Sequence, residues 1–530
     1  MLDSAVAAGH HTVDEGIGSW VTRRAFFAGD RIALVDGDRR ITYSELDWRT
    51  GQLADALREL GVRRGDRVAA LMTNSAAFLE TLFAAAKLGA VFVPINFRLA
   101  PPEVAHLLAD SGADVLVWSG HLSPLARAAL AGEGVRVRLR VVVGGQLADG
   151  EAEFEQLLAS GDPGTPRGGA TGRDVCALMY TSGTTGRPKG AMLTHDNLLW
   201  NVINILSNGR GMSQNDRAVT VAPMFHIGGL GAHTLPLLYV GGMNVVMPSF
   251  DPRETLAAMA RERVTLQFLV PAMWSALMAV PDFESYDLSA LELAMTGAAP
   301  CPRPVLDHFL DKGVLFREAF GLTETCGVTL LDPEHVRRKA GTIGRPGFHV
   351  RTRLVDEHDL DVPLGEVGEL VVSGPSVFAG YWGLPEATAE AFRGGWFHTG
   401  DLAREDDEGF LTLVDRSKDV IISGGENVYP VEVERILVQH PAVREVAVVG
   451  VPHVKWGETP LAVVVPGAEP PPTADELIAY VRERLAHFKC PTRVEFVPEL
   501  PRNATGKVLK TTLRTRYGTS EQQHAQGVQV

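Results

Sequence analysis

Apolar residues between Ile41 and Asn96 follow two alternating spacings. Residues 42–60, TYSELDWRTGQLADALREL, and residues 78–88, FLETLFAAAKL, have the spacing of helices and are each followed by glycine. RVAALM and AVFVPIN, which follow the two helices, are short and continuously apolar. Continuous apolar strands between helices are typical of a parallel sheet buried on both faces. The segment therefore predicts β–α–β architecture.

The same alternation returns from Asp216 to about Gly321, where the predicted helix ETLAAMARERV precedes the strand TLQFLV. From Arg345 to Leu413 the pattern changes to short strands, such as GELVVSG and GFLTLVD, separated by glycine and proline turns. This pattern predicts a smaller, mainly antiparallel β section that ends the N-terminal body.

A second compact unit is predicted after Asp415. It contains the helix VEVERILVQ, the strands EVAVVGV and LAVVVP, and a last helix that Thr473 and Glu476 should cap. Its size of about a hundred residues is ordinary for one domain. We therefore expect an α/β protein with a body over residues 1–415, a small α/β domain over 416–518, and a polar tail over 519–530.

Length, composition and charge narrow the class of protein. The chain has 530 residues, of which 45% are hydrophobic, so it can bury more than one core. Its net charge is −14, and its basic residues are dispersed. This distribution argues against a nucleic acid or an anionic membrane surface as the main partner. We count a homodimer as one possible assembly.

Cysteine usage and the first residues predict a cytoplasmic protein. The four cysteines are far apart and lack CxxC spacing, which argues against a disulfide framework or a cysteine metal site. The N-terminal residues contain Asp3 and lack the basic and apolar regions of a signal peptide. The sequence has no apolar run long enough to span a bilayer.

The strongest local signal for chemistry is YTSGTTGRPKG, from Tyr180 to Gly190, which follows the apolar run VCALM. Glycines and hydroxyl residues around Lys189 make a loop whose N–H and O–H groups can surround phosphate oxygens. It is not a Walker A loop, because Gly190 follows the lysine where serine or threonine is required. Taken by composition alone, the segment also fits a solvated turn.

This segment resembles the phosphate-binding signature of the adenylate-forming superfamily, which includes acyl- and aryl-CoA synthetases, nonribosomal peptide adenylation domains and beetle luciferases. Further segments of the chain resemble that family in the same order, and so many in order exclude chance. They are PMFHIGGL (223–230), TGAAP (296–300), FGLTET (320–325), GWFHTGD (395–401), DRSKD (415–419), ISGGENVYPVEVE (422–434) and PRNATGK (501–507).

The resemblance implies an ATP site in the N-terminal body. Glu324 would bind Mg²⁺ bridging the ATP phosphates, and a carboxylate is a suitable ligand for that hard cation. Asp401 would accept hydrogen bonds from the ribose hydroxyls, with Arg416 as its cationic companion. The remaining nucleotide contacts would come from Thr181, Ser182, Gly183, Thr184, Thr185, Gly186, Lys189, Gly297, Ala298, Ala299, Phe320, Gly321 and Thr323, among which Thr184 is assigned to catalysis.

Phe320 departs from the family pattern, which more often has tyrosine. A phenyl ring can still stack on adenine, but it cannot donate the hydrogen bond of a phenol. His226 would lie near the substrate carboxylate as a donor without permanent charge. A histidine among apolar residues is, however, more often an ordinary core group.

Residues of the C-terminal domain would serve the two half-reactions. By resemblance, Lys418 occupies the pivot of that mobile domain, and Gly424 and Gly425 lie where coenzyme A approaches the adenylate. Lys507 resembles the catalytic lysine that enters the site during adenylation. From the residues alone, Lys418 fits a solvated linker and Lys507 a surface lysine equally well.

The resulting function is an AMP-forming acyl-CoA synthetase that uses ATP, Mg²⁺ and coenzyme A. Because the segment around His226 has no acidic partner for an ammonium group and no carrier domain follows, a nonribosomal module is disfavoured. A ligase that loads a carrier protein, a luciferase-like oxygenase and an inactive nucleotide-binding scaffold remain alternatives. Five matching charged residues, Lys189, Glu324, Asp401, Arg416 and Lys507, disfavour the scaffold.

The acid itself is less well specified. The expected pocket wall over residues 226–229, 297–299 and 322–328 is apolar and rich in small residues, which predicts a hydrophobic chain or ring. We rank a fatty acid first, with a hydroxycinnamate or another aryl acid close behind.

Overall fold

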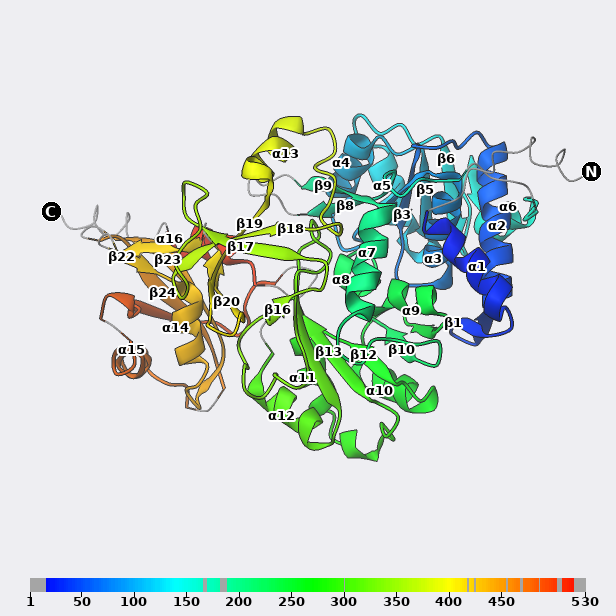
Figure 1. Ribbon diagram of the computed structural model, residues 1–530. Helices are drawn as coiled ribbons and strands as arrows, with labels where there is room; N and C mark the ends of the chain where they lie inside the picture. Colours follow the sequence, from blue (N-terminus) through cyan, green and yellow to red (C-terminus); the bar gives the residue numbers. More distant parts are fainter. Residues whose placement is uncertain are drawn as a thin grey trace, which may run out of the picture. The chain divides into compact units, whose positions relative to one another are not determined.

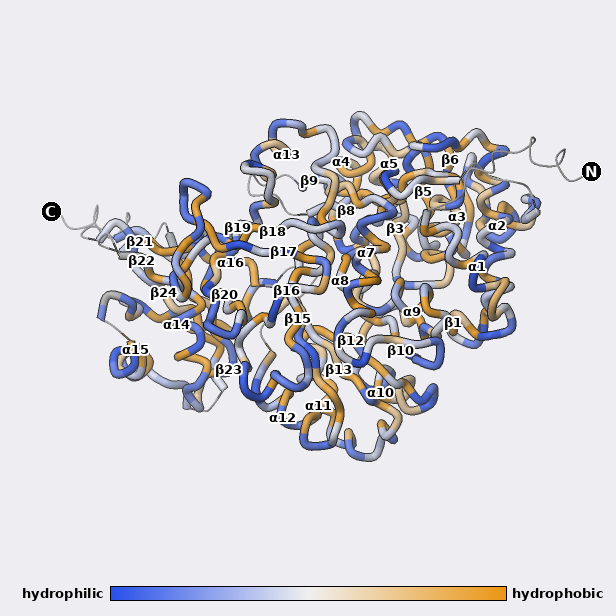
Figure 2. The backbone as a smooth tube through the Cα atoms, viewed as in Figure 1, coloured by the Kyte–Doolittle hydropathy of each residue, from blue (hydrophilic) through white to orange (hydrophobic). Residues whose placement is uncertain are grey.

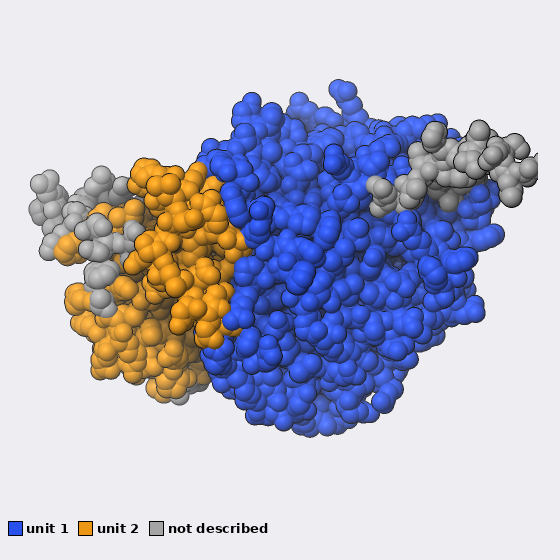
Figure 3. Space-filling model, viewed as in Figure 1, with its two compact units in different colours: residues 1–351, 372–397 blue, residues 352–371, 398–530 orange. Residues whose placement is uncertain are grey.

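The computed structural model describes residues 16–164, 169–181, 188–299, 301–416, 419–423, 426–453, 456–467, 470–485, 487–502 and 508–518. The chain forms two compact units, coloured separately in Figure 3. Unit 1 comprises Met1–Arg351 and Val372–Phe397, and unit 2 comprises Thr352–Val371 and His398–Val530. The domain boundary at residue 415 stays a prediction.

One sheet of unit 1 has seven strands, in the order β7-β6-β5-β3-β4-β8-β9. Its strand pairs are parallel except the last, β8 with β9. The strands are β3 (Arg67–Leu71), β4 (Val91–Pro94), β5 (Val115–Ser119), β6 (Leu139–Val143), β7 (Glu151–Glu153), β8 (Val175–Thr181) and β9 (Lys189–Thr194). The helices between and before them are α2 (Tyr43–Glu59), α3 (Ala76–Leu88), α4 (Pro101–Ser111), α5 (Ser123–Leu130) and α6 (Phe154–Ala159).

Local sequence signals set the ends of the first helices. Thr42 and Glu45 form a capping box at the start of α2, in which each side chain binds the other residue's backbone N–H. Ser75 caps α3, and Gly89 ends it in the left-handed conformation with φ 66°. The parallel α/β body predicted from the sequence is confirmed here.

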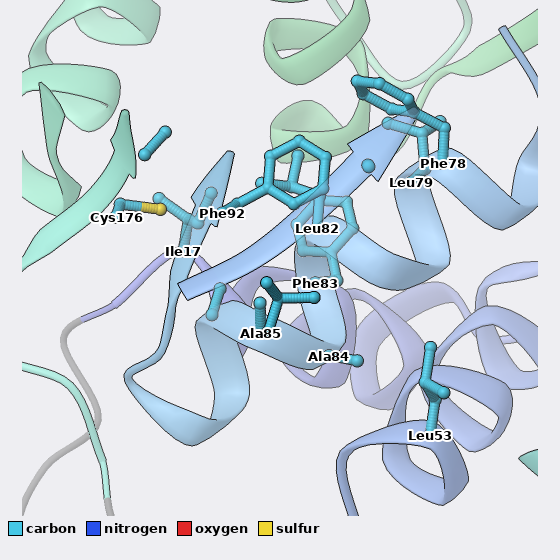
Figure 4. Packing of buried hydrophobic residues seen from close by; sticks show 14 of the residues in the cluster. Ile17, Leu53, Phe78, Leu79, Leu82, Phe83, Ala84, Ala85, Phe92 and Cys176 are labelled. Carbon is cyan, nitrogen blue, oxygen red and sulfur yellow. The ribbon is translucent and has the colours of Figure 1, made fainter. Parts of the chain in front are cut away.

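Helix α3 is the centre of the largest hydrophobic cluster. All of its residues are buried, and Figure 2 shows hydrophobic residues concentrated along it and the adjacent strands. Figure 4 shows Phe78 and Phe83 of α3 close to Phe92 of β4, and the Phe78 and Phe92 rings meet edge to face at 5.1 Å. Such close packing makes this sheet a rigid support for the loops at its edges.

Two further sheets complete unit 1 (Figure 1). One has the order β10-β11-β1-β2, with β1 (Ile32–Asp36), β2 (Arg39–Thr42), β10 (Arg217–Thr220) and β11 (Met243–Val246). The other has the order β12-β13-β14-β15-β16, with β12 (Leu266–Phe268), β13 (Leu293–Gly297), β14 (Leu315–Phe320), β15 (Thr329–Leu331) and β16 (Arg345–Pro346). In each of them, the strands that helices connect are parallel, as the alternation after Asp216 predicted.

The other helices of unit 1 lie around these sheets. They are α1 (Gly18–Ala28), α7 (His195–Leu206), α8 (Ile227–Gly229), α9 (Leu235–Val240), α10 (Pro252–Arg261), α11 (Pro271–Met278), α12 (Arg303–Asp311) and α13 (Pro385–Ala391). A π-helical turn, η2 (Leu230–Thr234), joins α8 to α9, and short 3₁₀ turns occur at Gly120–Leu122, Phe283–Ser285 and Arg393–Gly395.

Unit 2 holds two sheets. The first has the order β17-β18-β19-β20, with β17 (Arg351–Val355), β18 (Val367–Ser373), β19 (Phe397–Glu405) and β20 (Leu411–Arg416). The second has β22 (Glu426–Val428), β21 (Ile421–Ser423), β24 (Gly457–Pro466) and β23 (Val443–His453) in that order, with β25 (Arg493–Phe496) parallel to β24. The helices are α14 (Pro430–Leu437), α15 (Ala474–Arg482), the 3₁₀ turn His487–Lys489 and α16 (Lys510–Gly518).

Two sequence predictions for this part are met. The predicted strands EVAVVGV and LAVVVP lie within β23 and β24, and Thr473 and Glu476 form the predicted capping box of α15. The two strands pair in one long antiparallel ladder. The tail over 519–530 lies outside the described residues. Within the ranges that are described, every helix is too short or too polar to cross a membrane.

Candidate functional site

Thr181 and Lys189 mark the two ends of the predicted phosphate-binding segment. They are directly opposite each other at the end of the antiparallel pair β8 and β9. The loop between them therefore begins and ends at neighbouring points of the seven-stranded sheet. Ser182, Gly183, Thr184, Thr185 and Gly186, which the sequence assigns to the phosphates, lie outside the described residues.

Glu324 lies close to both ends of that loop. Its carboxylate is buried, and the hydroxyls of Thr181 and Tyr381 donate to the same oxygen, Oε1, at 3.2 and 3.1 Å. The Lys189 ammonium lies over the Tyr381 ring, 4.9 Å from its centroid. Thus Glu324, which is 143 residues away from Thr181 in sequence, lies beside Thr181, and Tyr381 links it to Lys189.

Tyr381 was not anticipated from the sequence. The segment around it follows β9 as an added strand: the N–H of Ala379 donates to the Met192 carbonyl, and that of Met192 donates to Gly380. The N–H of Trp382 also donates to the Gly190 carbonyl. These long-range backbone bonds help to fix Tyr381 beside Lys189, and no motif in the sequence around it indicated them.

A second group of predicted residues gathers at the carboxyl ends of β13 and β14. Gly297 and Ala319 are register partners, and a β-carbon built on Gly297 would lie 2.7 Å from the Ala319 carbonyl oxygen. At Gly321 it would lie 2.6 Å from the Cys326 carbonyl oxygen. Both positions therefore require glycine.

The loops after these two strands contain unusual backbone. Ala298 and Cys326 have φ angles of 70° and 60°, in the left-handed region that residues with a β-carbon rarely occupy. Ala299 follows the first of them, and Phe320 and Thr323 lie in the second segment. The carboxyl edge of parallel strands is the usual place for a ligand in α/β proteins, which agrees with the nucleotide contacts predicted there.

His226 lies immediately before the short helix α8, and its side chain is half-buried with the Nε2 atom fully buried. Its Nε2 has no hydrogen-bond partner among the described residues, and its ring lies against Phe225, with centroids 4.5 Å apart. Burial first, and then the nearby Arg98 charge, lower the His226 pKa to about 4. The imidazole is therefore neutral at neutral pH and has a free ring nitrogen.

Phe268, at the end of β12, is the aromatic residue nearest to two predicted pocket glycines. A β-carbon on Gly228 would lie 3.8 Å from the Phe268 ring, and one on Gly297 would lie 3.6 Å from it. Because neither glycine has a side chain, their backbone segments can approach the Phe268 ring, which is itself 6% exposed. Sequence analysis gave no role to Phe268, which lies outside the matching segments.

Asp401 is placed in unit 2. It is 5% exposed and is the register partner of Arg416 across β19 and β20. The preceding Gly400 has φ 71°, and its N–H donates to the Glu369 carboxylate at 3.0 Å. Glu369 thus fixes the turn before Asp401, a contact that the sequence did not reveal. The Arg416 side chain, and all of Lys418, Gly424, Gly425 and Lys507, lie outside what the structure describes.

Comparisons with known families agree with the motif order. The family model described as AMP-binding enzyme matches residues 21–382, and the model described as AMP-binding enzyme C-terminal domain matches residues 432–507. The first alone spans well over half of the chain.

Curated relatives match over nearly their full length. A feruloyl-CoA synthase of Amycolatopsis sp is 47% identical over 506 residues, which cover 95% of this chain and 100% of that protein. The long-chain-fatty-acid–CoA ligase FadD13 of Mycobacterium tuberculosis is 38% identical, covering 94% of this chain and 98% of its own.

Solved structures agree as well. The anthranilate CoA ligase AuaEII in complex with anthranoyl-AMP has a TM-score of 0.88 at 30% identity, covering 96% of this chain and 98% of that one. ATP-bound MatB from Rhodopseudomonas palustris has a TM-score of 0.86 at 32% identity, covering 95% and 99%. These matches confirm the predicted α/β fold with a separate C-terminal domain, and the chain therefore belongs to the AMP-binding enzyme family, as an AMP-forming acid–thiol ligase of the adenylate-forming acyl-CoA synthetase branch.

Proposed function

We propose that this ligase activates an aryl-propenoic acid of the hydroxycinnamate type. The observation that carries the proposal is the buried Phe268 ring, which two residues without side chains, Gly228 and Gly297, approach from the predicted pocket wall. An aromatic acid lying against that ring gains edge-to-face contact that a saturated chain lacks. The 47% identity to a feruloyl-CoA synthase supports the same choice over the fatty acid that the sequence ranked first.

A fatty acid is the second candidate. The predicted wall over residues 226–229 and 322–328 is apolar, and a fatty-acid ligase matches at 38% identity over a similar length. Both acids would follow the same two steps. The carboxylate attacks the α-phosphorus of ATP and pyrophosphate leaves. The thiol of coenzyme A, losing its proton, then attacks the acyl carbon, and AMP leaves.

The residues around Glu324 fit a magnesium ion. Both hydroxyl donors bind Oε1, and among the described residues none donates to Oε2. Mg²⁺ is commonly held by one or two carboxylates together with substrate phosphates. No group of three or more His, Cys, Asp or Glu that could hold an ion occurs in the described ranges, so Glu324 would act with the nucleotide itself. When bound, the ion would neutralise charge on the phosphates.

The charge and hydrogen-bonding capacity of the other predicted site residues suggest their roles. Lys189 and the loop from Thr181 would surround the phosphates, and neutral His226 would donate to the substrate carboxylate without adding a fixed charge. In unit 2, Asp401 would accept hydrogen bonds from the ribose. Lys507 would act in adenylation, and rotation about Lys418 would then present Gly424 and Gly425 to coenzyme A.

An acid panel tests the proposal. CoA-dependent release of AMP is measured with ferulate and related aryl-propenoates, straight-chain acids of six to sixteen carbons, acetate and amino acids. We expect the aryl-propenoates to have the highest kcat/KM. A higher kcat/KM for a straight-chain acid would favour the second candidate substrate, a fatty acid. A preference for acetate or an amino acid would contradict both candidates.

The pocket assignment has its own test. Gly228→Leu places a side chain at the Phe268 ring and should lower kcat/KM for the aryl acid by at least about tenfold, since one misplaced group costs about 1–3 kcal/mol. The KM for ATP should not change. Use of a carrier protein in place of coenzyme A, the cytoplasmic location and a homodimer remain predictions.

A further inference from the structure

Tyr381 lies between two opposite charges of the ATP site. Its hydroxyl donates to Glu324 Oε1 at 3.1 Å, and its ring faces the Lys189 ammonium, 4.9 Å from the ring centroid. One side chain thus contacts both the predicted metal ligand and the predicted phosphate-binding cation.

Neither charge has an ion-pair partner among the residues that the structure describes. The salt bridges between described residues include none to Glu324 or Lys189. Glu324 is stabilised by two neutral hydroxyl donors, and Lys189 by the negative face of an aromatic ring. Both arrangements stabilise a charge without cancelling it, so both charges stay available to a ligand.

The position of Tyr381 is rigid. Its N–H donates to the Thr388 hydroxyl at 2.9 Å, and its ring meets Phe378 edge to face at 4.9 Å. The Phe378 N–H donates to the Glu324 carbonyl at 2.8 Å, which joins the same segment to the backbone of the carboxylate. Its neighbours are bonded to β9, which begins at Lys189. Tyr381 is therefore fixed to both residues that it contacts.

We propose that Tyr381 is a positioning residue of the ATP site, which orients Glu324 for a divalent cation and keeps Lys189 from pairing with that carboxylate before the nucleotide binds. This inference rests on the proposed placement of Mg²⁺ at Glu324. Without the ring, the flexible lysine side chain would be free to form the ion pair, and Lys189 and Glu324 would then be occupied by each other.

Calorimetric binding of ATP separates the two roles, because it requires no turnover. Titrations are made without metal, in EDTA, and at increasing Mg²⁺. Tyr381→Phe keeps the ring and loses the hydroxyl. It should leave metal-free ATP affinity within about twofold and raise the Mg²⁺ concentration for half-maximal tightening about tenfold, the effect of one hydrogen bond to a charged group.

Tyr381→Leu also removes the ring. Metal-free ATP affinity should now fall about fivefold, because the cation–π contact is replaced by an ion pair that the phosphates must break. Adding Glu324→Gln to this variant should restore metal-free affinity, since the partner charge is gone. A local unfolding caused by the smaller side chain would not be repaired in this way.

Tyr43→Phe is the matched control. It loses a buried phenol hydrogen bond of 2.6 Å to the Gly242 carbonyl, outside the ATP site, and should change neither titration. Unaltered Mg²⁺ dependence in Tyr381→Phe, or no restoration in the double variant, would overturn the inference. If the unmodified enzyme binds ATP independently of Mg²⁺, the proposed placement of the metal at Glu324 is wrong. This result differs from one that contradicts only the positioning role of Tyr381.

Discussion

Two buried carboxylates of unit 1 are held in opposite ways. Glu80, on helix α3, is fully buried, and Arg49 donates to its two oxygens at 2.5 and 3.1 Å. Glu324 is 9% exposed and, among the described residues, accepts from two hydroxyls, both at one oxygen. The guanidinium neutralises its partner, whereas the hydroxyls do not.

Two lysines show the same contrast. Lys87, 5% exposed on α3, pairs with Asp47 at 2.5 Å. Lys189 instead lies over the ring of Tyr381. Within unit 1, the charges around α3 are thus used by the fold itself, while those at the ends of β8 and β9 are stabilised but not cancelled. Substitutions in the first region should therefore reduce stability, and those in the second should reduce activity.

Glu324→Gln should give the largest loss of activity. The amide keeps the shape of the side chain and can still accept from Thr181 and Tyr381, but it lacks the negative charge for the metal. We expect the rate of adenylate formation, measured by pyrophosphate exchange, to fall by a factor on the order of 10²–10³. Losses of other groups that stabilise transition-state charge have effects of this size. Stability should change by less than about 1 kcal/mol. If Glu324→Gln lowered stability but kept full activity, the charge of Glu324 would serve the fold rather than the ATP site.

Lys507→Ala extends the comparison to a lysine outside the described residues. If Lys507 serves only adenylation, that half-reaction should fall by a factor on the order of 10²–10³. Preformed acyl-adenylate should still be converted to thioester at a normal rate. By the same charge argument, acetylation of Lys507 should switch off adenylation. Equal impairment of both half-reactions in the Lys507→Ala variant would contradict the assignment.

Lys418→Pro is the reciprocal variant. Fixing φ at the predicted pivot should block the rotation of the C-terminal domain while leaving the first arrangement usable, if its φ is compatible with proline. Pyrophosphate exchange should survive, and thioester formation from preformed adenylate should be lost. Normal thioester formation would remove the pivot from the mechanism.

Glu80→Gln should reduce stability without a loss of activity. It leaves Arg49 without its buried partner, and breaking a buried ion pair from one side typically costs about 3–5 kcal/mol. Because Arg49 also contacts the half-exposed Glu155, we expect the lower end of that range, measured by urea denaturation. The control Glu155→Gln should cost less than about 1 kcal/mol. The KM for ATP should be normal in both variants.

The sequence predicted the body of the fold because its signals are local. Thr42, Ser75 and Gly89 end their helices through contacts within a few residues, and continuous apolar strands indicated the parallel sheet. The sequence interpretation grouped residues 352–371 with the N-terminal body, because their grouping with unit 2 depends on strand pairing that is not local in sequence.

The candidate site was predictable as far as its motifs extend. Thr181, Lys189 and Glu324 were found through matching segments, and the structure brings them together. Tyr381 and Glu369 were missed because each acts through a side-chain contact with a distant segment: Tyr381 reaches Glu324 across 57 residues, and Glu369 reaches Gly400 across 31. A single sequence contains no periodicity or spacing that reports such contacts.

The smallest expected effect concerns three neutral histidines, one in the site and two in the interior. Burial lowers the pKa of His226, His195 and His233 from 6.5 to about 4. Below pH 6.5 these histidines bind protons in the unfolded chain but remain neutral in the folded protein. Each one should therefore lower the stability of the folded state as the pH drops from 6.5 towards 4. His226→Gln removes one of the three, and should flatten the decline by about 1.4 kcal/mol per pH unit at most. Urea denaturation between pH 7 and 4.5 measures how stability changes with pH. His233→Gln is the control variant in the protein interior. It should also lose the hydrogen bond to Thr220 and therefore be less stable at pH 7. An unchanged slope in His226→Gln would mean that His226 is protonated in the folded enzyme, and would remove it as a neutral donor to the substrate carboxylate.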